Sequence, residues 1–210
     1  MYVFAEGEVT EEEYAEIVRA HGTRGTPGLD VICEFRTPRD RKPIPMVEDA
    51  VAFAHGVRRE ARKAKLTEDD DRWPQVWCLF DRDEHKFVRE AVALAEREQI
   101  GVAYSHPCFE LWRLLHYQNY TSTFAGVCNG ARDKLRGQNG FPQTYGPTIA
   151  KADDNLVKHV RAGQVLGGYQ QAKSYAKRIN AQHQHPDPCR WDPYTNVWTF
   201  VESALDITDY

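Results

Sequence analysis

The chain has 210 residues, of which 41% are hydrophobic and 28% are charged, and its formal net charge at pH 7 is -4. These values are ordinary for a folded globular protein and argue against a disordered, fibrous or membrane-embedded chain. The negative total also argues against a strongly basic nucleic-acid-binding protein.

The first 120 residues alternate between short apolar runs and helical patterns. Thr10, with Glu13 three residues on, has the spacing of a capping box and predicts the start of the first helix. A βαβαβαβα series predicts an α/β fold with an open, mostly parallel four-stranded sheet flanked by helices. The predicted strands cover residues 2–5, 29–35, 76–80 and 100–104, and the later helices cover residues 47–65, 86–98 and 108–117.

The alternation stops at about residue 119. Residues 119–150 are rich in Gly, Asn, Thr and Pro and predict an irregular stretch, and helical patterns return at 152–161, 168–180 and 197–205. We therefore predict a catalytic α/β core over residues 1–118 and a mainly helical C-terminal extension over residues 119–210 that packs on it.

The N-terminal residues lack the basic and apolar stretches of a signal peptide, and no apolar run is long enough to cross a bilayer. The five cysteines are widely spaced and none forms a C-x-x-C pair, so the sequence indicates neither a zinc site nor a disulfide framework. We expect a cytoplasmic setting with no membrane partner, and we expect Cys78 and Cys108 to be core residues.

Acidic and hydroxyl side chains follow three of the predicted strands. Because the carboxyl ends of parallel strands meet at one edge of a sheet, we expect these side chains to lie close together. Hard oxygen ligands of this kind suit Mg²⁺ or Mn²⁺. The residues are Glu6, Glu8 and Glu11 after the first strand, Asp81 and Asp83 after the third, and Ser105 and Glu110 after the fourth.

Two of these carboxylates have no obvious structural role. Glu6 ends a buried strand before a glycine and caps nothing evident. Asp81 follows four apolar residues and would be costly to hold there without a partner.

The other acidic residues have plausible structural roles as well. Glu11 lies in a helix first turn, where acids are favoured in any case. Asp83 could cap the next helix, and Glu110 could pair with Arg113. His85 and His106 flank the acidic clusters and are predicted to lie at the surface or to support ligands rather than to bind metal.

Three segments together resemble the RloB-like family. Residues 5–11 (AEGEVTE) resemble its opening Glu-Gly-x-x-Thr-Glu signature, and residues 77–85 (WCLFDRDEH) resemble its Asp-x-Asp segment. Residues 105–112 (SHPCFELW) resemble its Ser-Asn-Pro-Cys-Phe-Glu-Leu-Trp segment, with His106 in place of Asn. The C-terminal part of the chain also resembles the family, so the likeness spans most of the sequence in the right order.

The resemblance implies a Toprim-type catalytic domain, related to overcoming-lysogenization-defect nucleases, that binds divalent metal and carries out phosphoryl transfer. It implies metal-binding and catalytic roles for Glu6, Asp81 and Asp83. Glu11, Ser105 and Glu110 match the extra positions of the nuclease branch. It also implies a role in anti-phage defence, often with an AAA-type ATPase as partner.

The leading hypothesis is a Mg²⁺- or Mn²⁺-dependent nuclease in which Glu6, Asp81, Asp83 and Glu110 are catalytic, with DNA and RNA both open as substrates. A phosphatase of the haloacid-dehalogenase type also uses an Asp-x-Asp pair, but after its first strand. The main alternative is a non-catalytic Toprim-like subunit that binds nucleic acid or an ATPase. Metal affinity distinguishes the two hypotheses, because the absence of divalent-metal binding would favour the subunit over the nuclease.

The net charge divides unevenly along the chain. Residues 1–110 carry a net charge of -7, residues 111–200 carry +6, and the last ten residues carry -3. We therefore expect basic side chains of the C-terminal half to steer a phosphate backbone toward the acidic edge of the sheet.

Overall fold

Three parallel strands form the centre of the sheet in the computed structural model, which describes residues 1–210. These are β1 (Tyr2–Ala5), β4 (Val76–Asp81) and β5 (Gly101–His106). On one edge β3 (Glu34–Arg36) pairs in parallel with β1, and on the other β6 (Tyr194–Thr195) pairs antiparallel with β5. The strand order β3-β1-β4-β5-β6 confirms the predicted mostly parallel α/β sheet and adds a fifth strand from the C-terminal region.

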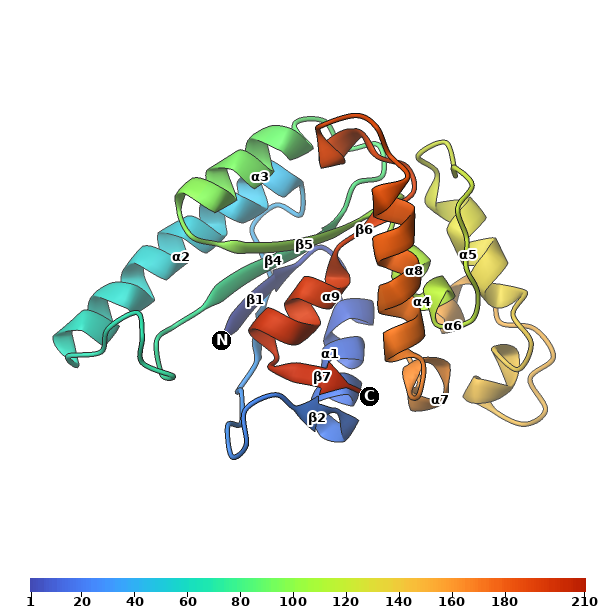
Figure 1. Cartoon of the computed structure of the whole chain (residues 1–210), viewed down its shortest axis with the longest axis horizontal. Coiled ribbons are helices and arrows are strands. Elements are labelled where there is room, and N and C mark those ends of the chain that lie inside the picture. The colour runs from blue at the N-terminus through green and yellow to red at the C-terminus, as the bar shows by residue number, and fades with distance from the viewer.

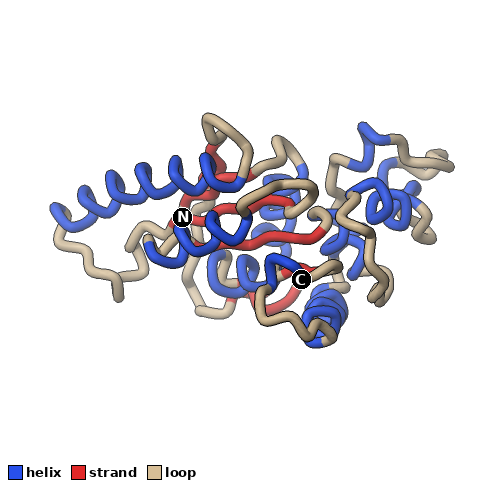
Figure 2. The backbone as a smooth tube through the Cα atoms, turned by 90° about the horizontal axis from the view of Figure 1, so that it is seen from above, coloured by secondary structure: helices blue, strands red, loops and turns tan.

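Helices cover both faces of the sheet (Figures 1 and 2). Side chains alternate along each strand, so Val3 and Leu79 enter one hydrophobic core while Phe4 and Phe80 enter the other. The second core is closed by α2 (Pro43–Lys63) and α3 (Val88–Arg97). The first is closed by α1 (Thr10–His21), α4 (Phe109–Leu115), α8 (Tyr169–Ala181) and α9 (Val197–Thr199).

Several element boundaries differ from the prediction. The strand predicted over residues 29–35 is reduced to β3, and the extended chain before it makes no ladder. Helix α2 begins at Pro43, four residues earlier than predicted, because proline is well suited to the first helical position. None of the helices is both long and apolar enough to cross a bilayer.

The predicted capping box is wrong. Thr10 is already helical, and the residue before it, Val9, makes no side-chain cap. The Thr10 hydroxyl instead donates to the Lys158 carbonyl oxygen over 2.7 Å. Glu13 accepts from the Val160 amide over 2.6 Å and contacts the His159 ring nitrogen at 2.9 Å. Both side chains therefore tie the C-terminal region to α1.

The C-terminal region is integrated with the α/β core. Residues of both predicted regions, among them Tyr14, Trp112 and Phe200, share one buried cluster. The division at residue 118 stays a prediction.

The remaining elements are short. They are β2 (Thr23–Arg24), which pairs with β7 (Ile207–Asp209), α5 (Cys128–Arg136), α6 (Asp154–Val157), α7 (Ala162–Val165), the 3₁₀ turns Pro142–Tyr145 and Pro188–Arg190, and the π-helical turn Phe200–Ala204.

A buried arginine fixes part of this region. Arg113 on α4 is fully buried and donates to the carbonyl oxygens of Val157 and His159 over 2.5 and 3.1 Å. It also donates to the Gln164 side-chain oxygen over 2.7 Å. These bonds satisfy acceptors that would be costly to bury alone, so Arg113 has a structural role and does not form the predicted pair with Glu110.

Candidate functional site

The candidate site lies beyond the carboxyl ends of β1 and β4. The chain passes from β1 to β3 on one side, while β4 lies on the other side of β1, so the strand order reverses between β1 and β4. Ligand sites of open α/β sheets form at such a switch point. A cavity of about 300 Å³ opens there and brings together five of the predicted acidic residues. Glu8 is exposed and paired with Arg41, and the four others, Glu6, Glu11, Asp81 and Glu110, are called the cavity carboxylates.

Glu6 is held by two donors at the end of β1. Its Oε2 accepts a hydrogen bond from the Asp81 backbone N–H over 3.0 Å. Its Oε1 lies 3.0 Å from Nε2 of His85, whose ring therefore supports Glu6, as the sequence predicts. The side chain is half-buried, so the carboxylate is oriented and still reachable from the cavity.

Glu11 lies in the first turn of α1 and is only 4% exposed. Its Oε2 is buried and has no hydrogen-bond partner. A Cβ atom at position 7 would lie 2.0 Å from this oxygen, so only glycine leaves room for the carboxylate. Burial, followed by the charges of Glu110 and Glu6, raises the pKa of Glu11 to about 7.

Asp81 is the last residue of β4. Its Oδ1 accepts a hydrogen bond from the Phe109 backbone N–H over 2.8 Å, at the first residue of α4. Desolvation raises the pKa of Asp81 well above its ordinary value, and the negative charges of the three other cavity carboxylates raise it further.

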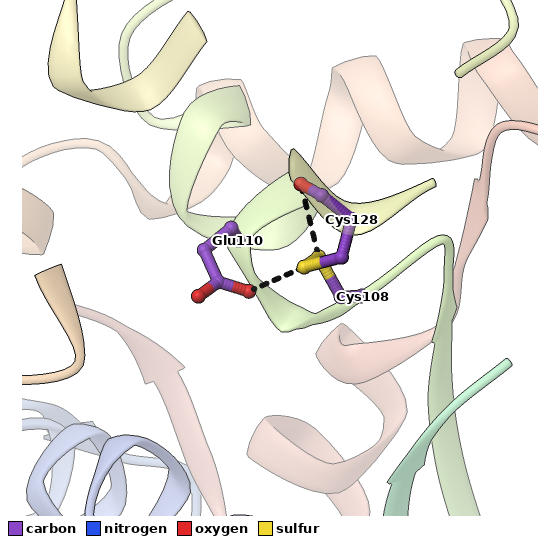
Figure 3. A group of neighbouring side chains, drawn as sticks. All are labelled: Cys108, Glu110 and Cys128. Carbon is purple, nitrogen blue, oxygen red and sulfur yellow. Dashed lines mark hydrogen bonds between the residues drawn. A yellow bond between two sulfur atoms is a disulfide. The ribbon is translucent and has the colours of Figure 1, made fainter. Parts of the chain in front are cut away.

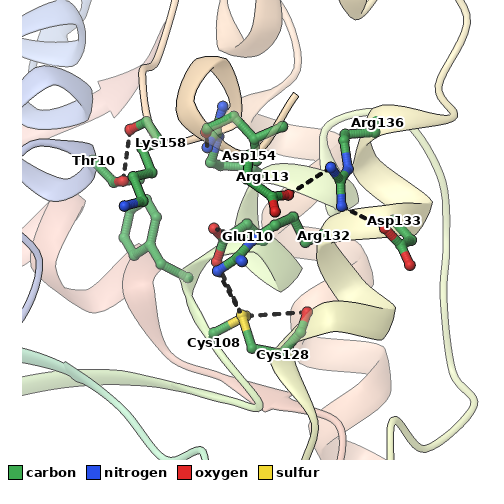
Figure 4. A network of polar contacts seen from close by, with 12 residues as sticks. Thr10, Cys108, Glu110, Arg113, Cys128, Arg132, Asp133, Arg136, Asp154 and Lys158 are labelled. Carbon is green, nitrogen blue, oxygen red and sulfur yellow. Dashed lines mark hydrogen bonds and ion pairs between the residues drawn. A yellow bond between two sulfur atoms is a disulfide. The ribbon is translucent and has the colours of Figure 1, made fainter. Parts of the chain in front are cut away.

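Glu110 reaches the cavity from α4 and is 6% exposed (Figure 4). Its Oε1 lies 3.5 Å from Nε of Arg132, and its Oε2 lies 3.5 Å from Sγ of Cys128. Glu110 therefore pairs with Arg132 and not with Arg113, the partner that the sequence predicted. The sequence gives no local signal for this pair, because Arg132 belongs to α5, which falls in the stretch predicted to be irregular.

A disulfide joins Cys108 to Cys128 beside Glu110 (Figure 3). The prediction of no disulfide is wrong here. The partners are 20 residues apart, and only the packing of α5 on α4 brings their Cα atoms to 5.5 Å. Cys78 and Cys108 are buried, as predicted.

The structure does not bring Asp83, Ser105 or His106 to the cavity. The Ser105 hydroxyl is buried and lies 2.8 Å from the Thr195 hydroxyl on β6. Asp83 lies beyond the end of β4, where its backbone N–H donates to the Pro107 carbonyl oxygen over 2.9 Å. His106 donates from Nδ1 to the Trp191 carbonyl oxygen over 2.7 Å, and burial lowers its pKa.

Three basic side chains line the rim of the cavity: Arg41, Arg132 and Lys158. Arg41 donates to the Glu6 carbonyl oxygen over 2.8 Å and to the Glu8 carboxylate over 2.6 Å. Lys158 is exposed, and its backbone is fixed by Thr10. Arg41 was not singled out by the sequence analysis, because nothing in its neighbourhood in the chain links it to β1.

The donor set suits a hard divalent cation. The four cavity carboxylates come from three chain segments, and one buried oxygen of Glu11 has no partner. Burying such a cluster without a compensating positive charge is unfavourable. Glu6, Glu11, Asp81 and Glu110 are therefore the residues that fit Mg²⁺ or Mn²⁺ as ligands.

We predict that the metal-free protein loses stability as the pH rises. The pKa of Glu11 is about 7 in the folded chain against an ordinary value of 4.5, so the folded state binds its proton more tightly. The resulting stabilisation is fully present below about pH 4.5 and is lost as the pH rises through about 7, a total change of about 3 kcal/mol. Urea unfolding in a chelating buffer across this range measures it.

Glu11→Gln should make this pH dependence less steep, because the amide does not titrate and the raised pKa of Asp81 contributes the remainder. Glu12→Gln is the matched control, since Glu12 is the exposed neighbour on the same helix turn. Equal slopes for the unsubstituted chain and Glu11→Gln would contradict the prediction.

The comparisons with known proteins give one match. The family described as RloB-like protein matches residues 1–203 of the chain. No curated protein and no solved structure matches it. The family match covers all four cavity carboxylates and the strands and helices that carry them. The chain therefore belongs to the RloB-like family.

Proposed function

We propose that the chain is a Mg²⁺- or Mn²⁺-dependent nuclease that hydrolyses phosphodiester bonds of DNA or RNA. The observation that carries the proposal is the convergence of Glu6, Glu11, Asp81 and Glu110 on one cavity at the switch point of the sheet. A structural role does not account for this cluster, because the four carboxylates repel one another and Glu11 has an unpartnered buried oxygen.

In this proposal the carboxylates bind the ion, and backbone N–H groups orient two of these carboxylates. The Phe109 N–H fixes Asp81, and the Asp81 N–H fixes Glu6, so two ligands are oriented by backbone rather than by flexible side chains. A bound divalent ion supplies positive charge that stabilises the phosphoryl oxygens in the transition state. As an alternative to holding the ion, Glu6 would accept the proton of the attacking water, and its contact with His85 would orient it for this role.

The basic rim supports a phosphodiester substrate over a neutral one. Arg41, Arg132 and Lys158 line the same cavity as the carboxylates, so a phosphate that enters it would meet positive charge. Arginine binds phosphate oxygens well because its planar guanidinium offers several donors. The acidic centre and the basic rim together match a metal ion and the backbone phosphates beside it.

We predict that Glu6→Gln and Asp81→Asn each reduce cleavage at least about 100-fold, because each removes a charged ligand and its orientation. The measurement is cleavage of mixed DNA and RNA with Mn²⁺, together with Mn²⁺ affinity by calorimetry. Glu16→Gln, an exposed acid on the outer part of α1, is the control and should cleave normally. No Mn²⁺ binding at millimolar concentration would favour the non-catalytic alternative.

A second prediction concerns substrate binding. Arg132→Gln should weaken nucleic-acid binding and lower the slope of affinity against salt by about one ion, because one phosphate contact is lost. Lys134→Gln on the same helix is the matched control, since Lys134 does not line the cavity. The measurement is fluorescence anisotropy with a labelled oligonucleotide in a chelating buffer, and an equal salt slope for the two variants would count against the contact.

We also propose a role in anti-phage defence, alongside an AAA-type ATPase partner. Membership of the RloB-like family is what supports this part of the proposal. Bacteria that express the chain together with a candidate AAA-type ATPase should plate phage less efficiently than bacteria that express Asp81→Asn with the same ATPase. Equal plating of the two would argue against a nuclease-dependent defence role.

A further inference from the structure

We infer that the Cys108–Cys128 disulfide is a thiol–disulfide exchange site that governs whether Glu110 is free to bind a cation. The inference rests on the proposed function, because it concerns one of the four proposed ligands. Its partner is a dithiol reductant, either a small molecule or a protein with two neighbouring thiols.

The disulfide adjoins two of the proposed ligands. Cys108 immediately precedes Phe109, whose N–H holds Asp81, and lies two residues before Glu110. Sγ of Cys128 lies 3.5 Å from Oε2 of Glu110. A change in this covalent link therefore acts directly on the acidic cavity.

The two sulfur atoms differ in access. Cys108 is fully buried, whereas Cys128 begins α5 and is half-buried, so Cys128 is the more accessible of the two to an external thiolate. The remaining cysteines, Cys33, Cys78 and Cys189, are free thiols. Nη2 of Arg132 lies 3.6 Å from Sγ of Cys128, so this sulfur also borders the basic lining of the cavity.

The exchange reaction balances with one dithiol. A thiolate of the reductant attacks Sγ of Cys128, the bond to Cys108 breaks, and Cys108 leaves as a thiolate that takes up a proton. The second thiol of the reductant then releases Cys128. Two electrons and two protons pass from the dithiol to the two cysteines, and the reductant ends as a disulfide.

Reduction of the disulfide changes the hydrogen bonding of Glu110. A disulfide sulfur carries no proton, so Oε2 of Glu110 receives no hydrogen bond from Cys128 and is available to a cation. A reduced Cys128 carries an S–H group that can donate to this oxygen. The oxidised chain therefore binds a divalent ion more tightly than the reduced chain.

A soft metal ion is a less suitable occupant of this place. The ligand atoms of Cys108, Glu110 and Cys128 lie within 4.8 Å of one another, which would suit such an ion after reduction. The guanidinium of Arg132, however, lies 3.5 Å from Glu110 and 3.6 Å from Cys128, and its charge opposes a second cation.

The test is Mn²⁺ calorimetry on the two redox states. The full chain is measured as prepared under air and again after treatment with dithiothreitol and removal of the reagent under nitrogen. Thiol titration under denaturing conditions should rise from three groups to five. The Kd for Mn²⁺ should rise about fivefold on reduction, as expected when one weak S–H hydrogen bond competes with the ion for Glu110.

Two substitutions at one position separate the donor from the covalent link. Cys128→Ser places a hydroxyl donor beside Glu110, so it should bind Mn²⁺ like the reduced chain in both conditions. Cys128→Ala has no donor, so it should bind like the oxidised chain in both conditions. Cys33→Ser is the control, because Cys33 is a half-buried free thiol away from the cavity, and it should keep the full redox response.

An unchanged Kd despite a thiol count of five would overturn the inference. Should Mn²⁺ bind in neither state, the proposed function would fail instead, and carbon NMR of the Glu110 carboxyl group would still decide the redox site. Its signal, identified by its absence in Glu110→Gln, should move on reduction, while that of Glu13 should not. A Glu110 signal that stays in place would reject the inference independently of metal binding.

Discussion

Four carboxylates that repel one another are held in one cavity, and much of the surrounding structure can be understood as the means of holding them. Desolvation and mutual repulsion raise the pKa values of Glu11 and Asp81, so the cluster works against the stability of the chain when it is ionised and empty. Backbone N–H groups at the ends of β4 and α4 offset part of this cost, because each donates to a carboxylate. The glycine at position 7 is required for the same reason, since any side chain there would occupy the place of the Glu11 carboxylate.

The strands and helices around this cavity hold the carboxylates in place despite their mutual repulsion. Strands β1 and β4 lie between two hydrophobic cores, so the backbone that orients Glu6 and Asp81 is packed on both faces. The C-terminal region completes the site from the side, because Arg113 fixes the chain around Val157 and His159, next to Lys158. The rim is therefore positioned by buried hydrogen bonds, while its charged ends remain at the cavity.

The sequence predicted the parts of the site that depend on strand ends. Glu6 and Asp81 could be placed because buried parallel strands end beside one another, and Glu110 because a helix follows β5 at the same edge. Ser105 and Asp83 could not be separated from them in this way, because their placement depends on the pleat of β5 and on the turn after β4. The capping box misled for a related reason, since Thr10 and Glu13 have partners 146 to 148 residues away that outweigh a local motif.

The C-terminal charge illustrates why regional net charge does not locate a binding surface. Of the basic residues that the sequence analysis grouped together, Arg113 is buried among carbonyl groups, Arg136 is paired with Asp133 and Asp154, and Lys173 is paired with Glu202. Arg132 and Lys158 are the ones from that group that line the cavity. The charge of Glu110 can be offset either by Arg132 or by a bound ion. Arg132 already offsets this charge from within the chain, and an ion bound there would have to share that carboxylate with it. In the proposed nuclease, an ion that draws Glu110 away from Arg132 would leave more donors of this guanidinium for a phosphate, so metal binding and substrate binding would favour each other.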